Sequence, residues 1–167
     1  MASTYSPIAT TTLGSNTASV SFNSFSGYTD IRLIMAVSTS DSGTVNDLKI
    51  SVNGDTSSGL YSSTRIYGSG TTAASDRTSG QNTWNSNGVL SNNSSPVGNI
   101  LCDFMNYSNT TTYKTMLMRD NVSGQYVISV VNLWRNTNAI TSINIAPAGG
   151  GNLISGSTFT IYGIKAA

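Results

Sequence analysis

The chain has 167 residues, a natural length for one domain, and its 38% hydrophobic residues are enough for a single core. Charged residues make up only 9%, against roughly 25% in an average soluble domain, and the net charge is +1. The eight Lys and Arg are scattered and form no basic stripe, which argues against a nucleic-acid partner.

The polar surface is built from uncharged residues. The chain contains 28 Ser, 22 Thr and 18 Asn but no Glu. Helical surfaces normally depend on Glu and Lys, whereas Thr is well tolerated on strands, so the composition favours an all-β fold. A net charge near zero gives little repulsion between copies, which favours self-association or docking on a larger body.

Period-two alternation, the signal of a strand, begins in the first third of the chain. It is clearest over residues 29–39 and returns over 47–55, with a further strand predicted at 63–70. The Asn53-Gly54 pair predicts a tight turn, because both residues accept a positive φ.

Residues 71–96 form the longest polar stretch. We interpret this stretch as an extended surface excursion with one short strand around Trp84.

The second half alternates regularly again, with strands predicted at five places linked by short turns: 99–107, 112–119, 125–135, 139–146 and 157–165. About eight to ten short strands predict one antiparallel, jelly-roll-like β-sandwich domain spanning residues 1–167. Two segments, 97–107 and 125–135, are apolar on both faces for part of their length. Either a central position in the sandwich or a second buried face at a subunit contact explains this, and the first is the simpler interpretation.

The sequence offers no evident catalytic constellation. There is no histidine, which removes the usual general base and zinc ligand, and Lys49 and Lys114 look like ordinary outward strand positions. Asp103 is expected on a strand, either facing solvent or hydrogen-bonded. Four other aspartates are expected in or beside turns, where Asp bonds its own backbone: Asp41, Asp47, Asp55 and Asp120. No catalytic, cofactor-binding or metal-ligating residue is therefore assigned.

Cys102 lies between apolar neighbours and is expected to be a buried small hydrophobe. The N-terminal residues have no basic region followed by an apolar one, so no secretion signal is expected. No apolar run approaches the ~20 residues that span a membrane, so no membrane partner is expected.

Four residues are candidate partner contacts: Arg65, Tyr67, Arg77 and Trp84. Trp84 with Tyr61 and Tyr67 can form a sugar-stacking platform; alternatively, Trp84 anchors the protein in a partner or covers the edge of the core. The two arginines can pair with carboxylates on a neighbouring subunit.

Several stretches resemble small tailed-phage virion proteins, notably the cement or decoration proteins of cyanophage-type capsids. They are YSPIATTTLGS (5–15), STRIYGSG (63–70), MNYSNTTTYKTMLMR (105–119), LWRNTNAITSINI (133–145) and GSTFTIYGIKAA (156–167). Related segments also occur in phage tail-fibre modules. The resemblance carries no catalytic residues and no cofactor.

The resemblance implies a jelly-roll-like homotrimer, made in the host bacterial cytoplasm, that binds the major capsid protein on the outer capsid surface of the virion. In this role it stabilises the assembled shell as a structural protein and not as an enzyme. The alternative is a tail-fibre or tail-tip module that recognises host surface glycans.

Overall fold

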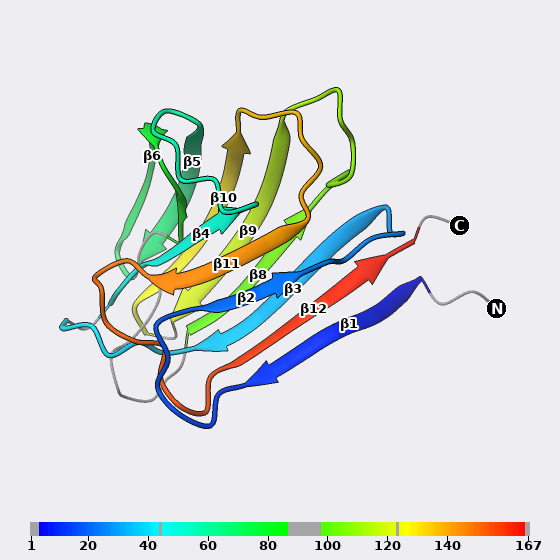
Figure 1. Ribbon diagram of the computed structural model, residues 1–167. Coiled ribbons are helices and arrows are strands. Elements are labelled where there is room, and N and C mark those ends of the chain that lie inside the picture. Colours follow the sequence, from blue (N-terminus) through cyan, green and yellow to red (C-terminus); the bar gives the residue numbers. More distant parts are fainter. Residues whose placement is uncertain (1–3, 44, 87–97, 123, 166–167) are drawn as a thin grey trace.

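The computed structural model describes residues 4–43, 45–86, 98–122 and 124–165 (Figure 1). Its regular elements are β1 Tyr5–Thr12, β2 Val20–Asn23, β3 Asp30–Val37, β4 Leu48–Val52, β5 Tyr61–Ser69, β6 Thr72–Gln81, β7 Trp84–Asn85, β8 Gly98–Phe104, β9 Lys114–Val122, β10 Tyr126–Trp134, β11 Ser142–Pro147 and β12 Thr158–Ile164. These elements are all strands, which confirms the all-β prediction. A search of the described residues finds no helix suited to crossing a membrane.

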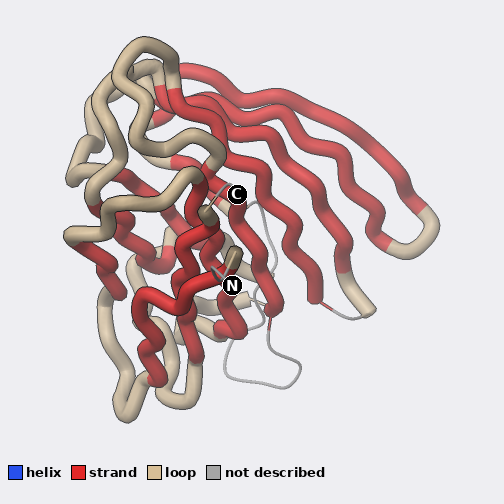
Figure 2. Tube along the Cα trace, turned by 90° about the vertical axis from the view of Figure 1, so that its right-hand side faces the viewer, coloured by secondary structure: helices blue, strands red, loops and turns tan. Residues whose placement is uncertain are grey.

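The strands form two antiparallel sheets. One has eight strands in the order β1-β12-β3-β8-β9-β10-β5-β6, and the other has four in the order β2-β11-β4-β7. The smaller sheet lies over one face of the larger (Figure 1), and the larger sheet extends beyond it on one side (Figure 2). The predicted antiparallel β-sandwich is confirmed, with two more strands than the upper expectation.

Strict alternation of buried and exposed residues places the core between the sheets. β9 is the clearest case, because each second residue from Lys114 to Val122 is buried and those between them are exposed. Side chains of successive strand residues point to opposite faces, so a single register decides which side chains enter the core.

Four aromatic rings connect the two sheets inside the core. Trp84 of the smaller sheet lies 5.3 Å from the ring of Tyr61 and 6.1 Å from that of Phe104, both on the larger sheet. The ring of Trp134 stacks on Tyr61 at 6.5 Å. Each buried polar group of these rings has a partner: the Trp84 indole donates to the Leu133 carbonyl, and the Trp134 indole and the Tyr61 hydroxyl both donate to Asp55. Burial of the rings therefore leaves no unpaired donor among them.

The Asn53-Gly54 turn forms as predicted, with φ of 55° and 66°. The Asn53 side chain also joins this turn to the start of β11. Its oxygen accepts from the backbone N–H of Thr141 at 2.7 Å, and its amide donates to the Ala139 carbonyl at 2.7 Å. Asn is therefore favoured at this position for two reasons: it tolerates a positive φ, and its side chain forms these hydrogen bonds.

The structure corrects part of the prediction for residues 71–96. Residues 72–81 form β6, which pairs with β5 along the edge of the larger sheet. An exposed edge strand needs no alternating apolar face, so its polar sequence had the signature of a loop. The expected short strand at Trp84 is present as β7, and residues 87–97 lie outside the described part of the chain.

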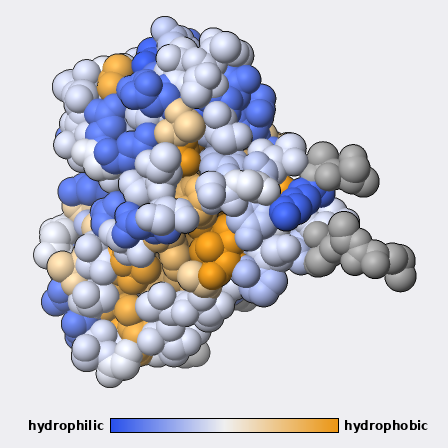
Figure 3. All heavy atoms as spheres, turned by 45° about the vertical axis from the view of Figure 1, so that its right-hand side comes forward, coloured by the Kyte–Doolittle hydropathy of each residue, from blue (hydrophilic) through white to orange (hydrophobic). Residues whose placement is uncertain are grey.

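The two segments that are apolar on both faces occupy interior positions, with β8 between β3 and β9 and β10 between β9 and β5. The central position is therefore observed, but it does not bury the second apolar face, because the outward residues Val127 and Val131 of β10 remain exposed. Figure 3, a view that does not look onto this outward face, shows a surface that is mostly pale, the colour of weakly polar residues, with apolar atoms gathered from the middle of the view toward its lower left.

We expect Asn53→Ala to lower the free energy of unfolding by about 2–3 kcal/mol, because it removes side-chain hydrogen bonds and leaves Ala at a positive φ. Urea unfolding measures this loss. The matched control is Asn82→Ala in an exposed turn, which should change the free energy by no more than about 0.5 kcal/mol. Equal losses in both variants would contradict the role assigned to Asn53.

Candidate functional site

The face of the larger sheet that points away from the smaller sheet, here called the open face, is hollowed. The hollow is a shallow space of about 1080 Å³, open to solvent and lined by residues from β12 at one side to β6 at the other. A sheet face in a two-layer sandwich is either packed on the core or left to solvent, so this hollow is the concave outer surface of the domain.

The strand registers arrange the outward residues of the open face in rows that cross the sheet. The Asp103 row is Tyr162, Arg32, Asp103, Leu117, Val131, Thr64 and Arg77. The Arg119 row is Thr160, Ile34, Leu101, Arg119, Ser129, Ile66 and Ser75. The Asn121 row is Thr158, Ala36, Asn99, Asn121, Val127, Gly68 and Ala73. The hollow follows the last two rows.

The open face carries large apolar side chains in contact with solvent. The most exposed are Val127 at 65%, Ile66 at 64%, Val131 at 51%, Leu117 at 48% and Ile34 at 42%. Single exposed apolar residues are ordinary, but here five belong to one sheet face, on four of its neighbouring or near-neighbouring strands. A group of exposed apolar side chains on one face of a sheet is typical of an interaction surface.

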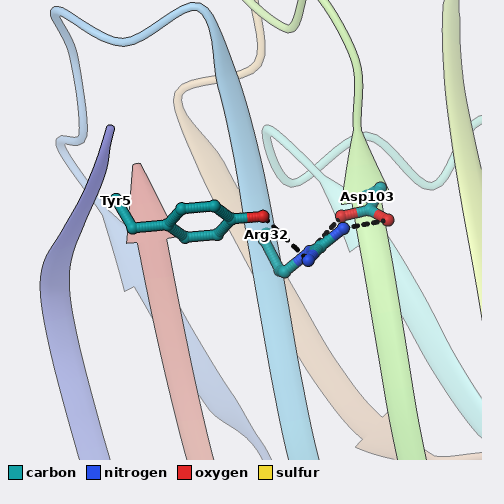
Figure 4. A network of polar contacts seen from close by, with 3 residues as sticks. All are labelled: Tyr5, Arg32 and Asp103. Carbon is teal, nitrogen blue, oxygen red and sulfur yellow. Dashed lines mark hydrogen bonds and ion pairs between the residues drawn. The ribbon is translucent and has the colours of Figure 1, made fainter. Parts of the chain in front are cut away.

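One side of the open face is polar and ordered by a network of three side chains (Figure 4). Arg32 of β3 donates to both carboxylate oxygens of Asp103 on β8, at 2.5 and 2.9 Å. Its remaining terminal nitrogen donates to the Tyr5 hydroxyl at 2.8 Å. The hydrogen bonds to Asp103 raise the pKa of Arg32 above its ordinary value. The prediction for Asp103 is confirmed, because it is a hydrogen-bonded strand residue.

The opposite, inward face of the same sheet contains a buried acid. Asp120 of β9 is 1% exposed, lies between Ile100 and Ile128 on the neighbouring strands, and has no hydrogen-bond partner for either carboxylate oxygen. Burial, with a further contribution from the charge of Asp47, raises its pKa to about 8, although the charge of Arg65 acts in the other direction. A carboxyl group in such a site is protonated at neutral pH.

The structure corrects the sequence interpretation of Asp120 and Lys114. Asp120 was expected beside a turn and Lys114 in an outward position, yet both are buried on the inward face of β9. The ammonium group of Lys114 donates to the backbone carbonyls of Thr112 and Thr137, and burial lowers its pKa. The alternation through Met116 and Met118 is a signal that places both residues inward, but the charge of each side chain argued against that position.

Two of the four candidate contacts lie together on β5. Arg65 pairs with Asp76 of the neighbouring strand at 2.7 Å and lies 5.0 Å from the ring centre of Tyr67. The carboxylate that was expected on a neighbouring subunit is therefore supplied by the same chain, and both side chains are only partly exposed.

The other two candidate contacts, Arg77 and Trp84, differ in their exposure to solvent. Arg77 is exposed on edge strand β6, at the end of the Asp103 row. Trp84 is fully buried, as is Tyr61. Of the alternatives for Trp84, the structure shows the one in which the ring covers the core, so a sugar-stacking platform of Trp84 and Tyr61 is not exposed.

The described residues offer little for metal or nucleophilic chemistry. Within 4–43, 45–86, 98–122 and 124–165, no three His, Cys, Asp or Glu side chains lie where they could share a metal ion. Cys102 is fully buried as expected, and burial raises the pKa of its thiol well above the ordinary value. A buried thiol of raised pKa is an unreactive one.

No family model and no curated protein matches this sequence. Among solved structures, the chain is similar to that of a mutant alginate lyase in complex with an alginate tetrasaccharide, with 8% sequence identity and a TM-score of 0.35. The match covers 95% of this chain and 80% of the lyase chain. A similarity at this level carries no argument about what this protein binds or does.

Asp120 makes the stability of the fold depend on pH. The pKa of its carboxyl is about 8 in the folded protein, against an ordinary value of 3.8 that applies to the unfolded chain. At pH values between these two, the folded state holds a proton that the unfolded state has lost. Stability therefore falls as the pH rises from about 4 to 8, by at most roughly 1.4 kcal/mol for each pH unit, and levels off above that range.

Urea unfolding at intervals from pH 5 to 8 measures this slope. In Asp120→Asn we expect most of the decline to disappear; Asp47, whose pKa is also raised by burial, contributes the remainder. Asp76→Asn is the control, because the Arg65 ion pair lowers the pKa of Asp76 and its effect on stability is confined to pH below about 4. An unchanged slope in Asp120→Asn would contradict this account.

Proposed function

We propose that this protein is a non-catalytic structural component of a tailed-phage virion, which decorates the outer capsid surface and stabilises the shell. The observation that supports this most directly is the open face, with its exposed Ile34, Ile66, Leu117, Val127 and Val131. Side chains of this kind gain free energy when a partner removes them from water. The resemblance of several stretches to decoration proteins, over nearly the whole chain except residues 71–96, suggests the identity of the partner, the major capsid protein.

The dimensions of the open face agree with a docking surface. Neighbouring strands lie about 4.8 Å apart and each residue adds about 3.3 Å, so eight strands of seven to ten residues cover roughly 34 Å by roughly 23–33 Å. This is roughly 800–1100 Å², enough for the ~800 Å² that each partner contributes to a stable protein interface. Since a shell presents the same site many times, each copy needs only a modest affinity.

The low charge of the surface is consistent with this role. Uncharged Ser, Thr and Asn form hydrogen bonds across an interface without the desolvation cost of an ion. Bound copies that contact only the assembled shell lower its free energy relative to the dissociated subunits. The trimeric state implied by the resemblance belongs to the same proposal.

The alternative, glycan recognition by a tail-fibre module, depended on an exposed aromatic platform around Trp84. Because Trp84 and Tyr61 are both fully buried, no specific observation favours it over protein contact.

Counting copies of this protein in purified virions tests the proposal. Quantitative mass spectrometry against the major capsid protein should give on the order of hundreds of copies per particle, as a repeating shell site requires. A handful of copies per particle would indicate a tail position and overturn the proposal. Mass photometry of the purified protein should give three times the mass of the chain. A monomeric mass would contradict the trimeric state within the proposal.

A further inference from the structure

The hollow on the open face has the length of a groove for a short segment of chain. It crosses seven strands, from β12 to β6, and six steps of about 4.8 Å give a length of roughly 29 Å. An extended segment of roughly nine residues spans this length at about 3.3 Å per residue.

One cation lies in the middle of this groove. Arg119 is exposed at the centre of the Arg119 row, with Leu101 on one side and Ser129 on the other. The two ion pairs formed by the described residues involve Arg32 and Arg65, and neither includes Arg119. A guanidinium in a largely apolar groove favours a ligand that brings a carboxylate to it.

The rest of the groove contains both aliphatic and hydrogen-bonding groups. Ile34 and Leu101 lie beside Arg119 on one flank, and Ile66 and Val127 lie on the other. The sheet has already used its backbone N–H and C=O groups in its own ladders, so a ligand crossing the strands must find side-chain partners. The exposed Asn99 side chain and the Asn121 side-chain oxygen can supply them, while the Asn121 amide already donates to the Asn99 backbone carbonyl at 3.3 Å.

A second copy of this chain does not suit the groove. A twofold axis through its centre would bring Arg119 close to the Arg119 of the partner, which is a repulsive contact, and two concave faces would meet only at their rims. An oligosaccharide is also less suitable. Tyr67 lines the groove, but strand alternation places it on the inward side of β5 beside Arg65, and neither the Arg119 row nor the Asn121 row contains a ring on which a sugar could stack.

We propose that this groove binds an extended segment of a partner protein, about nine residues long, in which a central Asp or Glu contacts Arg119 and aliphatic residues on both sides cover Ile34, Leu101, Ile66 and Val127. This inference deepens the proposed function and rests on it, since the segment would belong to the shell protein.

Selection from a random nonapeptide library tests the inference. Wild-type protein should enrich sequences with Asp or Glu between Val, Ile or Leu, and Arg119→Gln should not. For an enriched peptide, fluorescence anisotropy should show that Arg119→Gln weakens binding about tenfold or more and that the Asp→Asn peptide loses a similar factor, with no further loss when both changes are combined. Ile66→Ser provides a second groove variant, expected to weaken both peptides equally.

Lys49→Gln is the matched control, because Lys49 is an exposed cation on β4 of the smaller sheet, and its substitution should leave binding unchanged.

The inference is overturned if no acidic peptide is enriched, or if Arg119→Gln binds the enriched peptides as well as wild type does. Saturable binding of tetragalacturonate that Arg119→Gln abolishes, without peptide enrichment, would assign the groove to an acidic glycan instead. If the protein is abundant in virions but enriches no acidic peptide, this inference alone is refuted. If it enriches acidic peptides but is absent from virions, the proposed function alone is refuted.

Discussion

The packing of four aromatic rings between the sheets is the contact on which the rest of the structure depends. Trp84 comes from the short strand β7, while Tyr61, Phe104 and Trp134 come from three strands of the larger sheet. Because side chains alternate along a strand, the burial of these rings also determines which residues of the same strands point outward. The open face is therefore a consequence of the core: Val131 is exposed because the neighbouring Val130 is buried.

The two faces of the larger sheet have different chemistry. The inward face carries the core and two buried ionisable groups, Asp120 and Lys114, of which the first has no hydrogen-bond partner. The outward face combines aliphatic residues with a polar network at Arg32 and Asp103 and a single cation in the groove, Arg119. Stability that changes with pH belongs to the inward face, and recognition, in our proposal, belongs to the outward one.

Most of the fold could be predicted from the sequence, because alternation and the Asn53-Gly54 turn are local signals that the tertiary structure keeps. The edge strand β6 could not, since an exposed strand has no apolar face to alternate. The burial of Trp84 depends on rings that lie far away in the sequence, so the sequence alone leaves several alternatives for this residue. The groove was missed altogether: its rows exist only once the strand order is known, and single exposed residues such as Ile66 and Val127 carry no signal by themselves.

A cryo-electron microscopy reconstruction of the virion tests the central claim most directly, because the open face and the smaller sheet point in opposite directions and can be distinguished once the model is fitted. The account predicts density for this protein on the outer shell, with the concave face of the eight-stranded sheet against the major capsid protein and an extended segment of that protein beside Arg119. Density at the tail tip, or a copy on the shell that is attached through the four-stranded sheet with its concave face in solvent, would contradict it.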